Sequence, residues 1–366
     1  MLEFLKLHPE AFGLDTSERS VKFAQLRDSD GKQQLVSYGN IPLPQGILEK
    51  GEIKDEKKLA EHLRTIPQYT QGKKLSTPYV IASLPEEQTF LEIIQLPRMK
   101  RAELEHAIRA EAENYIPYSI DTMYLDFQVI SPAQKQEHTD VLLVAIPKET
   151  VDSYISVLQD AKLRPLALEV ESLSVGRALI SNQLPENPVL IVDIGLAGSS
   201  FSVFVGKSLR FTSSISIGAR QFTQSLMKTL QVAEKEADEL KESYGLQNQG
   251  ARGKEVMDAL IPPATDLVEQ VKKYIEYYSS RAQHQHPTKK NSEIRRVLLA
   301  GGGALLWGLP EFLARELQAE VELGNPWVNM GKGALKEIPP IPFRASLPYT
   351  PAIGLALYPF QKEIGI

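Results

Sequence analysis

VLIVDIGLAGSSFSVFVG, residues 189–206, consists of two apolar runs on either side of a turn of small residues. Apolar runs of this length around glycine and serine predict a β-hairpin, with Asp193 beside its turn. The start of the chain has the same order, because the apolar runs 11–15 and 20–28 flank the polar turn Thr16–Arg19. The two hairpins arise either from an internal duplication or by coincidence, and the pattern alone leaves both explanations open.

A third turn lies late in the chain, where VLLAGGG (297–303) runs from an apolar strand pattern into three glycines and then into a predicted helix at 309–317. Backbone N–H groups of tight turns bind phosphate oxygens, and small residues let a nucleotide approach the backbone. The carboxylates beside the two hairpins, Asp15 and Asp193, could also hold Mg²⁺ through water. Any one of these turns alone is more often a plain connection, but three in this order favour a site for a phosphorylated ligand.

The middle of the chain predicts a small α/β subdomain. RAELEHAIRAEAENYIP (101–117) places its apolar residues on one face and ends at a proline, which is typical of an amphipathic helix. Strands at 124–130 and 141–146 and a helix at 148–161 follow. We therefore expect a two-layer subdomain over about 85–165, a kind of unit that commonly serves as an insertion.

The composition excludes several classes of protein. A chain of 366 residues with 42% hydrophobic and 24% charged residues predicts two or three globular units. The absence of cysteine excludes disulfides, thiolate metal sites and a cysteine nucleophile. The 41 basic and 46 acidic residues give a net charge of −5, so no broad basic field favours nucleic acid. Without a secretory signal or an apolar run of roughly 18 residues, we expect a soluble, cytoplasmic protein.

Five segments of the chain resemble the type IV pilus assembly proteins PilM, relatives of the division protein FtsA within the actin-like ATPase superfamily. They are FGLDTSERSVK (12–22), LPRMKRAELEHAIRAEAENYIPYSIDTMYLDFQVI (96–130), VLLVAIPKETVDSYISVLQDAKLRPLALEVESLSVGRAL (141–179), VDIG (192–195) and LAGGGALLWGLPEFL (299–313). The segment 96–130 is the most diagnostic of PilM, since the phosphate turns are shared across the superfamily. The resemblance implies an α/β, actin-like (ribonuclease H-like) two-lobed ATPase fold with an FtsA-like inserted subdomain.

The resemblance also implies a division of the chain. Its parts are a first lobe from 1–84, the inserted subdomain 85–165, a connecting helix 166–185 that completes the first lobe, a second lobe 186–350 with a helical subdomain at about 219–295, and a C-terminal interlobe helix and tail at 351–366. Within the helical subdomain, the charge pattern predicts helices at 219–245 and 264–284, with an exposed loop at 247–255 between them.

In such a fold, ATP and Mg²⁺ bind in the cleft between the lobes, with Asp15 and Asp193 acting on the metal. Glu171 resembles the acidic residue that orients the attacking water, and Gly354 falls in the second interlobe helix. The residues implied in nucleotide binding are Asp15, Thr16, Ser17, Ser20, Lys22, Gly195, Gly198, Ser199, Ser200, Asp238, Lys241, Gly301, Gly302 and Gly303.

The first hairpin departs from the family pattern. Where the family has glycine and small hydroxyl residues, Ser17, Glu18 and Arg19 follow Thr16. A glutamate about 4 Å from a phosphate repels it by about 1 kcal/mol even with water-like screening, unless Arg19 offsets the charge. The second turn, Leu196-Ala197-Gly198, keeps one glycine beyond Gly195. We therefore expect at most a slow ATPase.

The resemblance implies a protein partner as the main output. Relatives bind the cytoplasmic N-terminal segment of the inner-membrane protein PilN, and here the residues of the partner groove would be Arg98, Met99, Tyr115 and Pro117. The chain would then act at the cytoplasmic face of the inner membrane, attached only through that partner, with self-association a further possibility. Two alternatives stay open: a nucleotide-free scaffold of the same fold, and a small-molecule kinase of the superfamily, for which no convincing general base is found.

Overall fold

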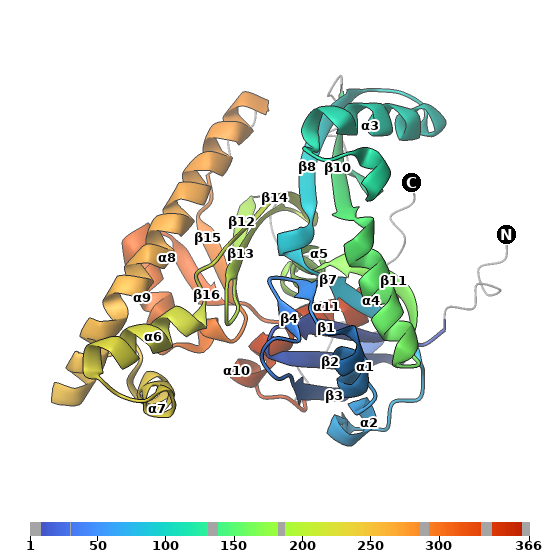
Figure 1. Ribbon diagram of the computed structural model, residues 1–366. Helices are drawn as coiled ribbons and strands as arrows, with labels where there is room; N and C mark the ends of the chain where they lie inside the picture. Colours follow the sequence, from blue (N-terminus) through green and yellow to red (C-terminus); the bar gives the residue numbers. More distant parts are fainter. Residues whose placement is uncertain are drawn as a thin grey trace. The chain divides into compact units, whose positions relative to one another are not determined.

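The computed structural model describes residues 9–29, 31–130, 138–181, 187–285, 293–330 and 339–360. The chain forms two compact units (Figure 1). Unit 1 consists of Met1–Ala178, Met330–Pro340 and Pro351–Ile366, and unit 2 of Leu179–Asn329 and Ile341–Thr350. The six-stranded and three-stranded sheets belong to unit 1, and the five-stranded sheet belongs to unit 2. The chain leaves unit 1 after Ala178 and returns to it in two later segments.

The sheet of unit 1 has six strands in the order β11-β7-β1-β2-β3-β6. Its strands are β1 (Phe12–Ser17), β2 (Ser20–Ser29), β3 (Lys32–Pro42), β6 (Gln71–Gly72), β7 (Tyr79–Leu84) and β11 (Arg164–Val170). The predicted first hairpin is confirmed, since β1 and β2 pair antiparallel up to Ser17 opposite Ser20. On its other side β1 pairs with β7 in parallel, which places the ends of these two strands together.

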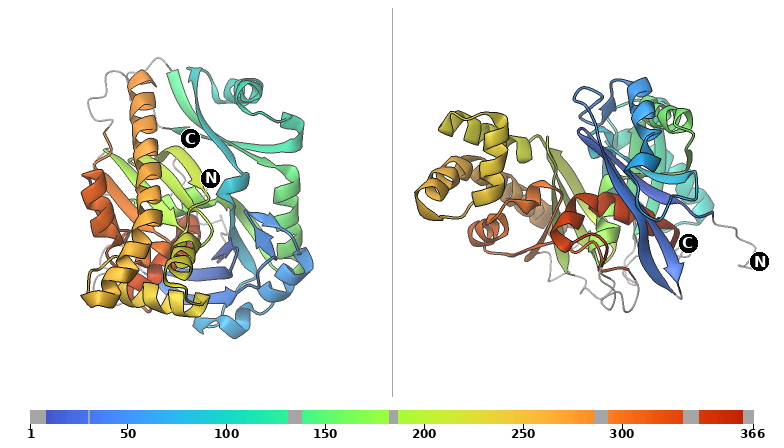
Figure 2. Two further views of the ribbon diagram at one scale, coloured as in Figure 1. Left: turned by 60° about the vertical axis from the view of Figure 1, so that its left-hand side comes forward. Right: turned by 90° about the horizontal axis from the view of Figure 1, so that it is seen from below.

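Helices cover both faces of this sheet (Figure 2). Apolar residues of α1 (Glu56–Leu63) and α4 (Lys148–Asp160) share one cluster with Phe12 and Leu14 of β1. On the opposite face, Leu355 of α11 (Thr350–Leu357) packs against Ile81. Smaller elements complete this part of the unit: β4 (Leu48–Glu49), β5 (Glu52–Ile53), α2 (Ile66–Tyr69), η2 (Glu86–Gln88), α5 (Glu171–Leu179) and η7 (Tyr358–Phe360).

The inserted subdomain contains a three-stranded sheet in the order β8-β10-β9, covered by α3. Its elements are β8 (Phe90–Pro97), α3 (Arg101–Tyr115), η3 (Ile120–Thr122), β9 (Met123–Ile130) and β10 (His138–Pro147). The predicted helix and the paired strands β9 and β10 are confirmed, whereas β8 was not predicted. The helix α4, predicted as part of this subdomain, instead packs Tyr154 and Val157 into the cluster of the six-stranded sheet.

Unit 2 contains a five-stranded sheet in the order β14-β13-β12-β15-β16. Its strands are β12 (Pro188–Ile194), β13 (Ser199–Val205), β14 (Ser208–Ile215), β15 (Arg296–Ala300) and β16 (Glu320–Leu323). The predicted second hairpin is confirmed as β12 and β13. Its helices are α6 (Ala219–Leu230), α7 (Glu234–Tyr244), α8 (Gly250–Gln285), η4 (Gly303–Leu305), α9 (Leu309–Leu317), α10 (Phe343–Ser346) and η6 (Leu347–Tyr349).

Three predicted elements differ from the structure. The helix predicted at 219–245 is two helices, α6 and α7, because α6 ends at Leu230, before Gln231 with its φ of 55°. The loop predicted at 247–255 is wrong from Gly250 onward, because Val256 and Ala259 of α8 pack into the core of unit 2 and extend the helix toward its N-terminus. Within the predicted connecting helix 166–185, residues up to Val170 belong to strand β11, and helix α5 begins only at Glu171. Among the residues that the structure describes, no helix is both long and apolar enough to cross a membrane.

Candidate functional site

The first hairpin holds a buried carboxylate near its turn. Asp15 is 4% exposed and lies opposite Lys22 in the ladder between β1 and β2. Ser83 Oγ, at the end of β7, donates a hydrogen bond of 2.9 Å to Asp15 Oδ1, and Thr16 N donates to Ser83 Oγ at 3.3 Å. Burial raises the pKa of Asp15, although the charge of Lys22 and the hydrogen bond from Ser83 oppose the shift. The carboxylate is thus fixed in place and has lost much of its hydration.

The hydroxyl groups of the turn lie together. Ser17 Oγ donates to the carbonyl oxygen of Ser20 at 2.9 Å, and Lys22 Nζ donates to Ser20 Oγ at 2.6 Å. The carboxylate of Glu18 accepts a hydrogen bond of 3.1 Å from the backbone N–H of Lys50. The structure therefore brings Asp15, Ser17, Ser20 and Lys22 together, and the acidic residue at the tip has a partner within unit 1.

The second hairpin also holds a buried aspartate, Asp193, near its turn. This residue is 8% exposed, lies opposite Ser200 in the ladder with β13 and next to Ala300 of the parallel strand β15. The turn closes through a hydrogen bond of 2.9 Å from Gly195 N to the carbonyl oxygen of Gly198. Ser199 Oγ donates to the carbonyl oxygen of Ile217 at 2.6 Å, so this hydroxyl is used in fixing the turn.

The late glycine turn contacts the end of β12. Gly301 has a φ of +80°, and a Cβ atom there would collide with Asp193 Oδ1 and with the carbonyl oxygen of Ile194. A Cβ at Gly303 would collide with the side chain of Ile194. At Gly302 the nearest atom would be Pro348 Cγ, 3.9 Å away. Two of the three glycines are thus required for packing, and the turn lies directly against the second hairpin.

The helix α7 contributes a polar cluster to unit 2. Lys241 Nζ donates to Asp238 Oδ1 at 2.6 Å, and Thr223 Oγ1 of α6 donates to the same oxygen at 2.8 Å. Partial burial acts to raise the pKa of Asp238, but the hydrogen bonds from Lys241 and Thr223 outweigh it and lower that pKa. The helix is followed by Leu246, whose N–H donates to the carbonyl oxygen of Trp307 at 2.7 Å. This bond ties the end of α7 to the segment that follows the glycine turn.

Glu171 is the first residue of α5, directly after strand β11. Its carbonyl oxygen accepts a hydrogen bond of 2.7 Å from Ser174 Oγ, so its backbone is fixed at the start of the helix. Burial, followed by the negative charges of Glu87, Asp15 and Glu171, raises the pKa of Tyr154. The carboxylates of Asp15 and Glu171 therefore both act on the buried hydroxyl group of Tyr154 in unit 1.

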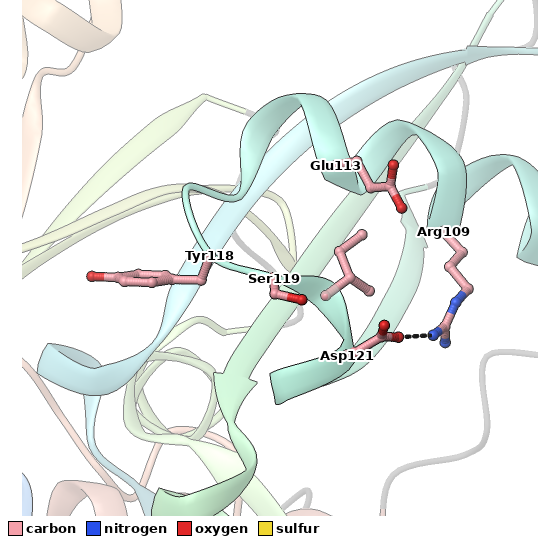
Figure 3. Close-up of a pocket in the computed structure, with 6 residues that line it drawn as sticks. Arg109, Glu113, Tyr118, Ser119 and Asp121 are labelled. Carbon is pink, nitrogen blue, oxygen red and sulfur yellow. Dashed lines mark hydrogen bonds and ion pairs between the residues drawn. The ribbon is translucent and has the colours of Figure 1, made fainter.

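The four predicted groove residues lie on the inserted subdomain in two settings. Met99 packs against the cluster beneath α3, while Arg98, Tyr115 and Pro117 are exposed, Tyr115 to 42%. A pocket of about 240 Å³ lies nearby at the C-terminal end of α3 (Figure 3). It is lined by Arg109, Glu113, Tyr118, Ser119, Ile120 and Asp121. None of the four predicted residues is among those that line it.

The pattern of the sequence missed two hydroxyl side chains. Ser83 binds Asp15 from a strand 68 positions away along the chain, and Thr223 binds Asp238 from α6. Neither has a local signal, because a single serine or threonine at the end of a strand or inside a helix is common. Within the described part of the chain, no group of three or more histidine, aspartate or glutamate side chains could hold a metal ion by itself.

A family model of the type IV pilus assembly protein PilM matches residues 13–360. The chain belongs to the PilM family. A solved PilM–PilN type IV pilus biogenesis complex superimposes with a TM-score of 0.81 and 25% identity, covering 97% of this chain and 99% of that one. These matches confirm the predicted family.

More distant relatives agree on the fold. MreB5 of Spiroplasma citri, solved with AMPPNP, superimposes with a TM-score of 0.55 at 10% identity, over 95% of each chain. The cell division protein FtsA of Agrobacterium fabrum is 26% identical over 245 residues, which is 62% of this chain and 53% of FtsA. This PilM family chain therefore spans about half the length of the curated relatives it matches. The predicted actin-like fold is confirmed.

Proposed function

We propose that this protein is a cytoplasmic assembly factor of the type IV pilus inner-membrane platform, and that it binds the N-terminal segment of a PilN-like membrane protein. The observation that carries this proposal is the PilM family match over residues 13–360, joined to the similarity with the PilM–PilN complex. In this proposal the protein reaches the inner membrane through its partner.

We further propose that ATP with Mg²⁺ serves as a structural switch. The proposal is supported by buried carboxylates, Asp15 and Asp193, beside the two hairpin turns, and by a glycine turn packed against Asp193. Bound Mg²⁺ would neutralise part of the phosphate charge. Asp15 and Asp193 would hold the ion through water, and Asp238 and Lys241 would meet the ribose and adenine.

The tip of the first hairpin bears on the choice between a nucleotide switch and a nucleotide-free scaffold. The hydrogen bond from Lys50 N to the Glu18 carboxylate offsets part of that negative charge, which lowers the repulsion expected toward a phosphate. Glu171 would orient water for hydrolysis, and we propose a slow reaction at most, because the hairpin turns lack most of the glycines of the family pattern.

Thermal unfolding with Mg-ATP tests the nucleotide proposal. A ligand at 100 times its Kd stabilises the folded state by about 2.7 kcal/mol. Lys241→Met should reduce the increase in melting temperature, whereas Lys254→Met, on an exposed position of α8, should leave it unchanged. Absence of any increase up to millimolar Mg-ATP in the unaltered protein would favour the scaffold.

Partner binding is tested by calorimetry with a synthetic peptide of the N-terminal segment of the PilN-like protein. Deleting residues 85–165 would remove α4 from the core of the six-stranded sheet, so point variants are the sharper probe. Tyr115→Ala should weaken binding, and Tyr69→Ala provides a matched control because these tyrosines are 42% and 40% exposed. If Tyr115→Ala and Tyr69→Ala bind the peptide with equal affinity, Tyr115 does not belong to the partner groove. A nucleotide switch further requires that Mg-ATP change the affinity for the peptide.

A further inference from the structure

A two-residue turn joins the short strands β4 and β5. Its central residues, Lys50 and Gly51, have φ values of 48° and 76°, so both lie in the left-handed region. This is the pattern of a type I′ hairpin turn, in which the second position is usually glycine. A non-glycine residue such as Lys50 adopts this conformation at some cost, and it persists where surrounding contacts hold it.

Three different elements bind the backbone of this turn. The carboxylate of Glu18, from the first hairpin, accepts from Lys50 N at 3.1 Å. Gln88 Nε2, from η2, donates to the carbonyl oxygen of Lys50 at 3.1 Å. The buried hydroxyl of Tyr154, from α4, donates to the carbonyl oxygen of Gly51 at 3.1 Å. The β4–β5 turn is thereby held by the first hairpin, by η2 and by α4.

The short helix η2 connects the six-stranded sheet to the inserted subdomain. The helix lies between β7 of the six-stranded sheet and β8, the first strand of the inserted subdomain. A Cβ atom on Gly51 would collide with Pro85, directly before η2, so the turn and this segment are in close contact. The β4–β5 turn therefore lies between the tip of the first hairpin and the entry to the inserted subdomain.

We infer that Glu18 is a positioning residue, which links the tip of the first hairpin through the β4–β5 turn to the entry of the inserted subdomain. The contacts of Glu18 are made by the chain itself, so the link does not require a nucleotide. Only the expectation that Mg-ATP acts through this link rests on the proposed function. The backbone of the neighbouring tip residue, Arg19, is held by a different contact, because its carbonyl oxygen accepts a hydrogen bond of 2.8 Å from Leu43 N. The tip of the first hairpin is hydrogen-bonded to the β4–β5 turn through the Glu18 carboxylate, which accepts from Lys50 N. A shift of the tip is therefore transmitted through Lys50 to Gln88, which donates to the Lys50 carbonyl oxygen.

Hydrogen exchange at single amides of the full chain, without nucleotide, tests the link. Glu18→Ala should accelerate exchange at Lys50 by roughly fivefold to tenfold, the effect of losing one hydrogen bond, and at Gln88 and Thr89 by at least about twofold. Glu18→Gln keeps the accepting oxygen and should behave like the unaltered protein. Glu49→Ala, at an exposed position of the same hairpin, is the matched control. Acceleration confined to Lys50, or equal acceleration in the control, would overturn the inference.

A second measurement adds Mg-ATP and separates the link from the proposed switch. Exchange at 86–89 should change on addition of Mg-ATP in the unaltered protein and in Glu18→Gln, and this response should be lost in Glu18→Ala while Mg-ATP still raises its melting temperature. A response that persists in Glu18→Ala would show that another route carries it and would overturn the inference. If Mg-ATP neither binds nor alters exchange in the unaltered protein, the switch fails, and the nucleotide-free measurement still decides the link.

Discussion

Among the glycines that the structure describes in unit 1, Gly354 leaves the least room for a side chain, and it therefore gives a strong test of the packing between α5 and α11. A Cβ atom there would lie 1.8 Å from the carbonyl oxygen of Ser174 in α5, whereas ordinary contacts begin at 3.4 Å. Gly354→Ala gains about 1 kcal/mol in helix propensity. The collision is with backbone, so α11 and α5 must separate by well over an ångström, and we take the cost at the upper end of overpacking, about 3 kcal/mol. The expected net loss is about 2 kcal/mol.

For a unit of about 200 residues, such a loss lowers the melting temperature by roughly 4–8 °C. Differential scanning calorimetry measures it, with Gly302→Ala as the control because its new Cβ would meet only Pro348, 3.9 Å away. Replacing Ser174 by glycine should not rescue Gly354→Ala, since the obstructing atom belongs to the backbone. A melting temperature for Gly354→Ala within about 1 °C of the control would refute the close approach of α5 and α11.

Three further predictions concern the buried and paired polar groups. Because burial raises the pKa of Asp15, its ionisation destabilises the fold as pH rises above the ordinary value of 3.8. Asp15→Asn should therefore melt higher than the unaltered protein at pH 7, lose this advantage near pH 4, and respond less to Mg-ATP; a lower melting temperature at pH 7 would contradict this reasoning. The pKa of Asp238 is lowered, so its contribution to stability is present above 3.8 and lost as pH falls below that value. The difference in melting temperature between Asp238→Asn and the unaltered protein should be constant from pH 5 to 7 and shrink below about pH 4, and a constant difference down to pH 2 would count against the cluster. Ser83→Ala should raise the pKa of Asp15 further, which NMR titration of the Asp15 carboxyl carbon measures; an unchanged or lower pKa would show that the hydrogen bond has no net effect.

The parts of the fold with strong local patterns could be predicted from the sequence. Apolar runs around small turns predict both hairpins, and the spacing of apolar residues in 101–117 predicts α3. The first half of α8 was missed because its glycines and polar residues are typical of a loop, although its buried positions, Val256 and Ala259, have helical spacing. Strand β8 was missed since adjacent Ile93 and Ile94 are both buried, which breaks the alternation of a half-exposed strand.

The candidate site was predictable where its residues lie in turns with a local pattern or in segments that carry the family resemblance. The turn patterns pointed to Asp15, Asp193 and the late glycines, and the structure places the glycine turn against Asp193. The resemblance added Asp238 and Lys241, which lie together on α7. The contact between Glu18 and Lys50 could not be predicted, because it depends on how β4 and β5 fold back beside the first hairpin. Likewise, α4 follows the inserted subdomain without a break, and only its packing shows that it belongs to the six-stranded sheet.

The discontinuity of unit 1 has a consequence for synthesis on the ribosome. The strands of its sheet emerge first, but α11, which packs on one face of that sheet against Gly13 and Ile81, emerges only after unit 2 has been made. Domains fold as they leave the ribosome, so unit 2 has nearly all of its residues available before unit 1 can close. During that interval Ile81 and the neighbouring apolar surface lack their covering helix. This nascent surface is therefore the point at which chaperones would be needed, and truncation before residue 350 should leave unit 1 unable to mature even though its strands are all present.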